Sequence, residues 1–445
     1  MNRKVSHLQW RWPSLTALAL ALMVALAVAA CGSSSSTTSG GGASSAPPAG
    51  SNAASTGSSQ GSGGSSSGDA IKVMTIVDYT TPNGRVDFNQ LNGVEGAINA
   101  ANASGAINGK HIVLLHCDAH SSPSAAAACA NEAIHSGAVA IVNNQVNEDF
   151  ITTPLLMKAG IPIVGNNPST PPGQSDPNSA CFVTSTVPTF VGMITALAQQ
   201  DHVKKIGVLE PPIPGAVQIN AALKAAAQVN GVQITNVVPV GFTVTNFGPA
   251  LQQVLSGGTE AIIPFAGGGP AALAALIQQA KQINPNVKFV FPSFELTPPF
   301  LAAAGPAEQG SLAVGYTQFS SATSSPGVAE FQSEVSKINQ DSAHSDTALW
   351  AWTGAHAFVK LAQSIQGPIT RASVSTALKG LKNLDLGGVT PPYTYGFNTY
   401  GLGCIVNGSP AVGRISGHGV AAISGNNLIN VMSPSVVEAV KKYSH

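Results

Sequence analysis

Short apolar runs alternate with helical segments along most of this chain, and the stretch from Asn108 to Asn147 shows the pattern most clearly. Its first apolar run is Ile112–Leu115. The alanine-rich stretch Ala125–Ile134 has high helical propensity and is followed by Ser136-Gly137, a usual way for a helix to end. A second apolar run, Ala138–Val142, comes next. A strand, a helix and a strand within about 30 residues predict a βαβ unit with a right-handed crossover.

The same alternation extends to both sides of this unit. Before it, Ile71–Val77 predicts a strand, and Asn92–Ala103 has apolar residues at helical spacing, with Gly93 and Gly96 allowing close packing. The later predicted strands are Ile161–Val164, Lys205–Leu209, Val232–Val238, Ala261–Phe265 and Val287–Phe291. The later predicted helices are Phe150–Ala159, Val191–Gln200, Ala216–Val229, Phe247–Leu255, Ala271–Ile283, Val328–Asn339, Ala348–Ile365 and Arg371–Leu381. This order predicts an α/β fold with parallel sheets flanked by helices.

Polar residues stand where the second apolar run of the βαβ unit ends. Asn144 and Gln145 follow Ala138–Val142 almost directly. Ligands of parallel sheets bind beyond the carboxyl ends of the strands, so these two side chains are predicted to meet a ligand. The alternative is that they satisfy polar groups of their own loop.

Composition narrows the classes of function. Of the 445 residues only 9% are charged and the formal net charge is zero, so no basic surface for nucleic acid is expected. Hydrophobic residues make up 44%, which is ample for the cores of two or three domains. The motif G-x-S-x-G occurs at Gly57–Gly61, but it lacks the flanking strand and helix that a nucleophile elbow needs. No other spacing indicates an activated nucleophile or paired acids, so we expect no enzyme.

Residues 1–31 are predicted to be a targeting segment. Basic residues stand near the start, and Leu15–Ala30 is an apolar run of the length of a signal-peptide core. The small residues before Cys31 resemble the bacterial lipobox, which implies cleavage before Cys31 and lipidation of its thiol. The alternatives are an ordinary signal peptide or a single anchor helix. Residues 32–69 are mostly Ser, Gly, Ala and Thr and predict a flexible tether.

The folded part begins near Ala70, and its start carries a family resemblance. Gly105–Gly109 (GAING), with the Cys117-Asp118 pair that ends the following strand, resembles the first lobe of the type I periplasmic-binding-protein fold. More narrowly, it is similar to the branched-chain amino-acid (Leu/Ile/Val-type) substrate-binding lipoproteins of ABC importers. The resemblance covers residue 70 to the end. It implies two Rossmann-like lobes that close around a ligand on a three-strand hinge, like a Venus flytrap.

Two discontinuous lobes follow from this resemblance, because the chain would cross between them three times. The expected crossings are Cys181–Thr186, Gly310–Tyr316 and Leu386–Asn398. The expected lobe boundaries are residues 70–183 plus 317–385 for lobe 1 and residues 184–316 plus 386–445 for lobe 2.

Four cysteines remain if Cys31 is lipidated, and an even number in an exported protein indicates disulfides, with three possible connectivities. Cys117 ends a strand and Cys129 lies in the helix after it. A short loop makes this pair geometrically easy, and pairing at this location is a habit of the family. Cys181 and Cys404 remain, near the first and third crossings. We therefore expect disulfides Cys117–Cys129 and Cys181–Cys404; the alternative is that some are free buried thiols.

By position, the resemblance also implies a ligand site in the cleft between the lobes. The loop at Asn144-Gln145 matches one that contacts ligand in the family, and Asn167–Ser169 matches the loop whose hydroxyl often meets an amino-acid head group. Glu295 falls where some members place an acid that faces the ligand's ammonium. The full set of expected ligand-binding residues is Tyr79, Asn144, Gln145, Asn167, Ser169, Phe265, Glu295 and Tyr316. The alternatives are polar groups that satisfy their own loops and aromatic residues of the strand-end core.

Two departures from the family pattern bear on the ligand. Pro211–Gly215 stands where many amino-acid binders have an aromatic residue followed by glycine, and Gly165–Pro168 is more polar than the usual small-residue form. Both argue against a branched-chain amino acid. They leave open a polar or larger solute such as an amide, a short peptide or an aromatic acid.

The sequence also contains residues that could bind zinc or a nicotinamide dinucleotide, but we expect neither. Zinc-ligand residue types gather in one stretch, at His111, His116, Cys117, His120, Cys129 and His135. However, no C-x-x-C or H-E-x-x-H spacing occurs, and disulfide formation would remove the cysteines as ligands. Gly267–Ala272 fits the dinucleotide pattern G-x-G-x-x-A, with Glu295 closing the next strand. An exported lipoprotein, however, rarely meets a nicotinamide cofactor.

The resemblance therefore implies a lipid-anchored solute-binding protein on the extracytoplasmic face of the cell membrane. It would be a monomer that hands an amino acid, or a related polar or aromatic solute, to an ABC permease. A sensor that passes a signal to a membrane partner would use the same cleft and is the alternative.

Overall fold

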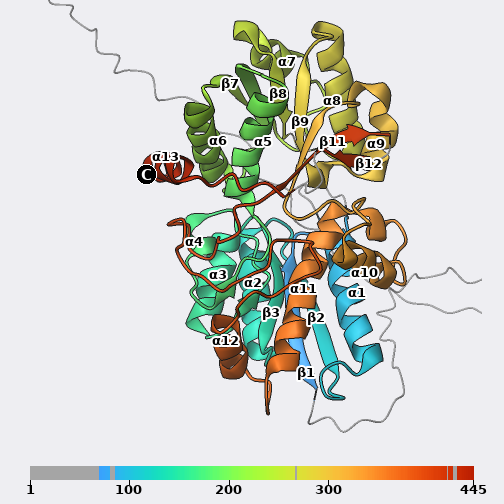
Figure 1. The fold of residues 1–445 in the computed structure, drawn as a ribbon, viewed down its shortest axis with the longest axis vertical. Coiled ribbons are helices and arrows are strands. Elements are labelled where there is room, and N and C mark those ends of the chain that lie inside the picture. The colour runs from blue at the N-terminus through green and yellow to red at the C-terminus, as the bar shows by residue number, and fades with distance from the viewer. Residues whose placement is uncertain (1–69, 81–85, 266–267, 418, 424–427, 445) are drawn as a thin grey trace, which may run out of the picture. The chain divides into compact units, whose positions relative to one another are not determined.

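The computed structural model describes residues 70–80, 86–265, 268–417, 419–423 and 428–444 (Figure 1). The expected targeting segment, the lipidation site Cys31 and the tether at residues 32–69 lie outside the described residues. Within the described part of the chain, no helix has both the length and the apolar character needed to cross a membrane.

The first sheet has five parallel strands in the order β2-β1-β3-β4-β5. These strands are β1 (Ile71–Val77), β2 (Ile112–Asp118), β3 (Ala140–Gln145), β4 (Ile163–Val164) and β5 (Ser179–Ala180). The helices between them are α1 (Asn89–Ser104), α2 (Pro123–His135), α3 (Asp149–Lys158) and α4 (Pro171–Gln174). The predicted βαβ unit is confirmed as β2, α2 and β3. Its strand β3 and the neighbouring β1 are buried almost throughout, as apolar runs in a parallel sheet should be.

The second sheet has seven strands in the order β12-β11-β10-β9-β8-β6-β7. Its parallel strands are β6 (Lys205–Glu210), β7 (Gln233–Pro239), β8 (Ala261–Pro264), β9 (Lys288–Pro292) and β10 (Leu312–Gly315). The associated helices are α5 (Thr186–Gln200), α6 (Ala216–Asn230), α7 (Gly248–Val254), α8 (Pro270–Ile283) and α9 (Pro298–Ala304). Single 3₁₀ turns are η1 (Ser256–Gly258), η2 (Ser293–Glu295), η3 (Gly305–Ala307) and η4 (Ser342–His344). Two antiparallel strands, β11 (Ala411–Ser416) and β12 (Gly419–Ala422), extend the sheet where the apolar pattern predicts no strand.

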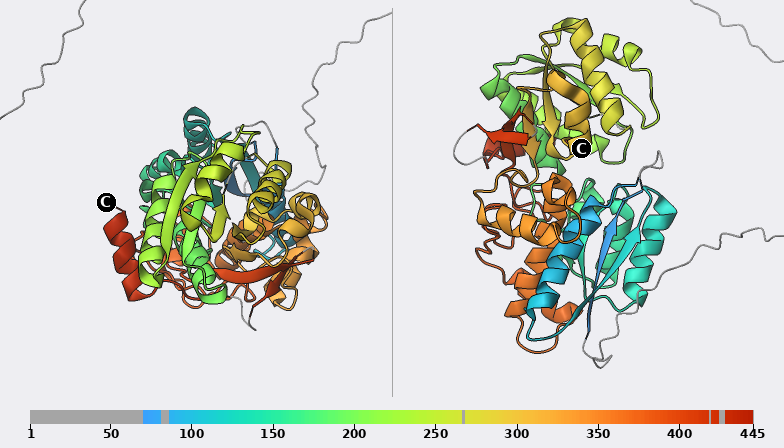
Figure 2. Two further views of the ribbon diagram at one scale, coloured as in Figure 1. Left: turned by 90° about the horizontal axis from the view of Figure 1, so that it is seen from above. Right: turned by 90° about the vertical axis from the view of Figure 1, so that its right-hand side faces the viewer.

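After β10 the chain returns to the first sheet. Three helices follow β10: α10 (Pro326–Val335), α11 (Asp346–Ser364) and α12 (Arg371–Lys379). Helices α10 and α11 pack against α1, and both Figure 1 and Figure 2 show these elements side by side. We call the first sheet with α1–α4 and α10–α12 lobe 1. The second sheet with α5–α9 and α13 (Pro434–Tyr443), which packs against α6, is lobe 2.

The close packing predicted at Gly93 and Gly96 is confirmed. A Cβ atom at Gly93 would lie 2.2 Å from the Ala348 carbonyl oxygen on α11. A Cβ atom at Gly96 would lie 2.6 Å from Cγ2 of Val335 on α10. These two glycines therefore allow α1 to contact both returning helices.

The chain passes between the lobes after β5, after β10 and before β11. The first two passages are joined where the Thr184 N–H donates to the Tyr316 carbonyl oxygen at 3.0 Å. The third passage comes later than the resemblance implies. Leu386 and Val389 pack in the core of lobe 1, and the Gly387 carbonyl oxygen accepts a hydrogen bond from the Gly327 N–H of α10 at 2.9 Å. The segment expected to open lobe 2 at residue 386 therefore packs within lobe 1.

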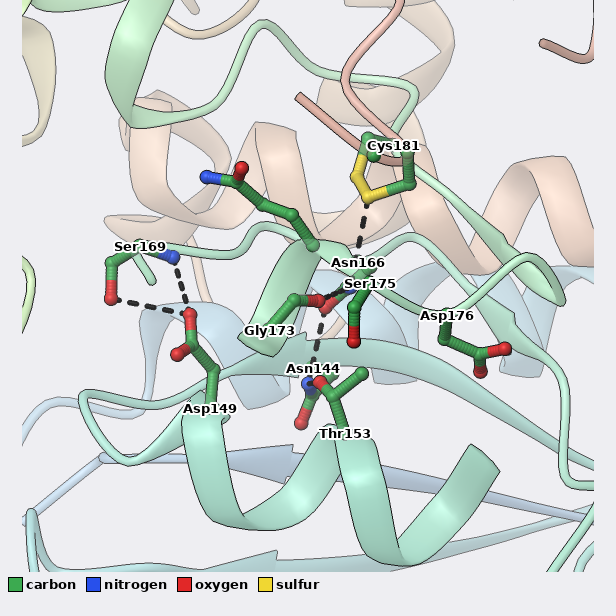
Figure 3. The surroundings of a disulfide bond; sticks show 12 residues. Asn144, Asp149, Thr153, Asn166, Ser169, Gly173, Ser175, Asp176 and Cys181 are labelled. Carbon is green, nitrogen blue, oxygen red and sulfur yellow. Dashed lines mark hydrogen bonds between the residues drawn. A yellow bond between two sulfur atoms is a disulfide. The ribbon is translucent and has the colours of Figure 1, made fainter. Parts of the chain in front are cut away.

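Both expected disulfides are present. Cys117–Cys129 links β2 to α2, and Cys181–Cys404 links the first passage to the chain before the third. The Cα atoms are 5.5 Å apart in each pair, an ordinary separation. Figure 3 shows the second disulfide with Asn166, whose Nδ2 donates to Cys404 Sγ at 3.8 Å. This disulfide thus lies directly beside the loop that leads to Ser169.

Candidate functional site

A cavity of about 250 Å³ lies between the two lobes. Lobe 1 lines it with strand-end residues such as Asp78 after β1 and Gln145 at the end of β3, and with Trp350 of α11. Lobe 2 lines it with residues such as Phe190 of α5 and Phe265, which follows β8. The carboxyl ends of parallel strands from both sheets therefore meet at one place, where ligands of such sheets bind.

Five aromatic side chains form one continuous wall of this cavity. We call this set the aromatic wall: Phe190, Phe265, Phe294, Tyr316 and Trp350. Neighbouring ring centroids along the wall are 4.8–5.8 Å apart. Tyr316 and Trp350 are stacked, with an angle of 24° between their planes. At such separations aromatic rings attract one another, and a further ring entering the cavity would gain the same interaction.

Two buried polar atoms on residues that line the cavity have no hydrogen-bond partner among the described residues. Gln145 offers Oε1, an acceptor, and Trp350 offers Nε1, a donor. An unsatisfied buried polar group costs about 1–3 kcal/mol, which a partner on a ligand would offset. The cavity therefore combines an apolar wall with one free acceptor and one free donor.

Asp78 holds two loops of lobe 1 at the edge of the cavity. Its Oδ1 accepts a hydrogen bond from the Ser121 N–H at 2.7 Å, and its Oδ2 accepts one from the Asn147 N–H at 2.8 Å. Burial raises the pKa of Asp78, while the two backbone hydrogen bonds oppose that shift. The carboxylate thus positions Ser121 and Asn147, both of which line the cavity.

Ser169 is held at the cavity by Asp149, the first residue of α3. The Asp149 carboxylate accepts hydrogen bonds from the backbone N–H groups and from the hydroxyls of Ser169 and Thr170. Figure 3 shows the bonds to Ser169. Burial raises the pKa of Asp149 to about 6, although these hydrogen bonds oppose the shift. Gly173 leaves room for the carboxylate, because a Cβ atom there would lie 2.5 Å from Asp149 Cγ.

The structure brings together five of the eight residues expected to bind ligand. Gln145, Ser169, Phe265, Glu295 and Tyr316 line the cavity. The other three, Tyr79, Asn144 and Asn167, are not among its lining residues.

Each of these three residues has another place in lobe 1. Asn144 is fully buried, and its side chain bonds with Thr152, Thr153 and Asn166, because successive residues of a strand point to opposite faces. Tyr79 packs on Phe88, with ring centroids 5.3 Å apart. Asn167 is 4% exposed.

Several residues that line the cavity are not predicted from the sequence. Asp78 follows β1, so the strand-end rule that predicts Gln145 would also have found it. Phe190 and Trp350 lie in helices whose residues are buried on more than one face, so helical periodicity does not separate cavity residues from core residues. Phe294 lies in a 3₁₀ turn that has no sequence signature of its own.

The structure shows where several of the possible zinc ligands and the glycine-rich loop lie. Cys117 and Cys129 are bonded to each other, so neither is available as a metal ligand. His120 Nδ1 lies 3.2 Å from Asp118 Oδ2, and the His116 ring packs 6.3 Å from the Tyr79 ring, centroid to centroid. Gly268 and Gly269 line the cavity, whereas Gly267 lies outside the described residues.

Glu148, beside Asp149, makes the stability of lobe 1 depend on pH. Its side chain is buried with Oε2 unpaired, and burial, followed by the charge of Asp78, raises its pKa from 4.5 to about 7. The folded state therefore holds this proton more tightly than the unfolded chain does. As pH rises from about 4.5 to 7, this group lowers the free energy of unfolding.

We expect Glu148→Gln to raise the free energy of unfolding by about 1–3 kcal/mol at pH 8 and to change it little at pH 5. Urea unfolding at the two pH values measures the difference. Glu132→Gln, which neutralises an exposed carboxylate on α2, is the matched control and should show no such pH dependence. An equal effect of Glu148→Gln at both pH values would contradict the expectation.

A family model described as periplasmic binding protein matches residues 70–399. No curated protein matches the chain. Among solved structures, the chain is similar to a possible leucine/isoleucine/valine-binding protein from Rhodopirellula baltica. The two share 18% identity and a TM-score of 0.67, over 80% of this chain and 96% of that one.

Two further solved structures were described with a bound ligand. A branched-chain amino acid ABC transporter protein from Thermus thermophilus with bound valine is 16% identical, with a TM-score of 0.66 over 83% of this chain and 98% of that one. An ABC transporter solute binding protein from R. palustris, in complex with 4-hydroxybenzoate, is 19% identical, with a TM-score of 0.63 over 81% of this chain and 95% of that one. At these identities the similarity shows a shared fold.

Proposed function

The chain belongs to the periplasmic binding protein family, and we propose that it is a lipid-anchored monomeric receptor that delivers a small solute to an ABC importer. The family membership confirms the resemblance seen at Gly105–Gly109 and Cys117-Asp118. A solute-binding role needs no catalytic group in the cavity. The proposal adds a lipid on Cys31, a place on the extracytoplasmic face of the membrane and a permease as partner.

The observation that carries the proposal is the aromatic-walled cavity between the lobes. Lobe 1 contributes Gln145 and Trp350, and lobe 2 contributes Phe190, Phe265 and Phe294. A solute held there would contact both lobes at once. Ligand contacts of this kind favour the closed arrangement of two lobes over the open one, which gives a permease a signal that the receptor is loaded.

The cavity favours a small solute with a ring. Its volume of about 250 Å³ lies just below the range of about 300–1,000 Å³ typical of ligand pockets. A planar ring would pack on the aromatic wall, while Gln145, Ser169 and Trp350 would bond with polar groups at its edge. We therefore propose an aromatic acid or aromatic amino acid as the ligand class. The R. palustris protein was solved with an aromatic acid, and the Thermus thermophilus protein with valine.

Native mass spectrometry tests the binding function. The chain expressed from Gly32 and gently purified is expected to carry a small molecule that is released on denaturation. A thermal-shift screen over amino acids, amides and aromatic acids then ranks ligand classes, since a ligand at 100 times its Kd stabilises by about 2.7 kcal/mol. Aromatic solutes should give the largest shifts. If the purified chain is empty and no solute in the screen shifts its Tm, the proposed receptor function fails.

The same instrument tests the anchor. When the whole sequence is expressed in bacteria, the protein recovered from the membranes should lack residues 1–30 and carry added lipid mass on Cys31. An unmodified Cys31 in that material would remove the anchor from the proposal and leave the binding function untouched.

A further inference from the structure

Three metal-ligand side chains meet on lobe 1, outside the solute cavity. Glu330 and Glu334 stand four residues apart on α10, so both project from the same helix face. His356 lies on α11, which packs beside α10. One ligand atom from each residue lies within 4.8 Å of the other two. None of the three lines the solute cavity.

His356 supplies an observation beyond the proximity of two acids. The residue is 7% exposed, and its Nε2 is buried without a hydrogen-bond partner among the described residues. Glu330 Oε2 is 3.8 Å from that nitrogen, which is too far for a hydrogen bond. This buried nitrogen is therefore available to bind a metal ion.

Trp352 contacts both His356 and Glu334. Its ring stacks on the His356 ring, with centroids 4.2 Å apart and an interplanar angle of 17°. Its Nε1 donates a hydrogen bond to Glu334 Oε2 at 2.6 Å. Outer contacts of this kind hold metal ligands in position.

Positive charges also lie near the cluster. Lys337 and Lys360 are close enough for their positive charges to act on the Glu334 carboxyl group. Among the described residues, however, neither lysine forms an ion pair with Glu330 or Glu334.

We propose that Glu330, Glu334 and His356 bind a divalent transition-metal ion, of which zinc is the best match. Zinc takes imidazole nitrogen and carboxylate oxygen at about 2.0–2.2 Å, which places tetrahedral ligand atoms about 3.3 Å apart. His356 Nε2 and Glu330 Oε2 are 3.8 Å apart and all three ligand atoms lie within 4.8 Å of one another, so a small inward movement would bring them to this spacing. The Glu330 side chain is 48% exposed, so it can make this movement and leave room for a water in the fourth position. The ion would join α10 to α11.

Zinc titration by calorimetry on the chain pretreated with a chelator tests the site. The wild-type chain should bind one zinc ion tightly, and Glu330→Gln should weaken that binding at least about tenfold. Because Glu330 is half-exposed, this variant keeps the fold. His356→Gln should weaken binding further, and Glu438→Gln, at an exposed acid on α13, is the control and should bind as the wild type does.

Zinc should also raise the Tm of the wild-type chain and of Glu438→Gln, and this gain should be lost in Glu330→Gln. The proposal is overturned if the wild-type chain binds no zinc. It is equally overturned if Glu330→Gln and His356→Gln bind zinc as tightly as the wild type. The cluster would then be a buried histidine with two acidic neighbours. Neither result bears on solute binding, because the two sites share no residue.

Discussion

Replacing Trp350 with leucine is expected to weaken solute binding by about 30- to 150-fold. The change removes a ring that stacks on Tyr316 with centroids 4.8 Å apart, and it removes the unpaired Nε1 donor. Buried tryptophans at the centre of a binding surface commonly contribute about 2–3 kcal/mol, which corresponds to that factor. Trp350→Phe keeps a ring but loses the donor, so it should show an intermediate loss. The gap between the two variants measures the part due to the N–H group.

Calorimetry with the solute identified by mass spectrometry measures these affinities, and urea unfolding of each variant corrects for loss of folded protein. Trp352→Leu is the matched control, because Trp352 lies on the same helix, is fully buried and does not line the cavity. It should lower stability while leaving the affinity for solute near that of the wild type. If Trp350→Leu bound solute as tightly as the wild type, the aromatic wall would have no part in binding.

Gly93→Ala is expected to lower the free energy of unfolding by about 2–3 kcal/mol, and Gly93→Val is expected to prevent folding of lobe 1. Helix propensity alone predicts the opposite for alanine, a gain of about 1 kcal/mol in α1. The structure reverses the sign, because the new Cβ would lie 2.2 Å from the Ala348 carbonyl oxygen and 3.0 Å from its carbon. These are backbone atoms, so the helices must separate to relieve the overlap.

This change should also reach the solute site, because Ala348 is two residues before Trp350 on α11. Urea unfolding measures the loss of stability, and Asn99→Val, at an exposed position of α1, controls for the helix propensity of valine. The control should lose less than about 1 kcal/mol. A Gly93→Ala protein as stable as the wild type would show that α1 and α11 do not approach as closely as described.

The sequence and the structure agree best where one local pattern decides the outcome. Strand β1 is mostly apolar and β3 begins in the apolar run Ala138–Val142, so the pattern of the chain predicts both. Gln145 and Asn144 show the limit of this reasoning. Both stand at the end of β3, yet one lines the cavity and the other is buried among Thr152, Thr153 and Asn166. Which face of the strand meets the ligand depends on packing between elements.

The sequence by itself determined the α/β class, the parallel direction of most strands and the family, because these follow from apolar periodicity, helix endings and short motifs close together in the chain. The tertiary structure alone decided that the segment after residue 386 still packs in lobe 1 and that β11 and β12 extend the second sheet. It also decided that Trp350 meets Phe294 and that His356 meets Glu330. These pairs join residues from different elements, and their contacts depend on how whole helices and sheets pack, which no local pattern records.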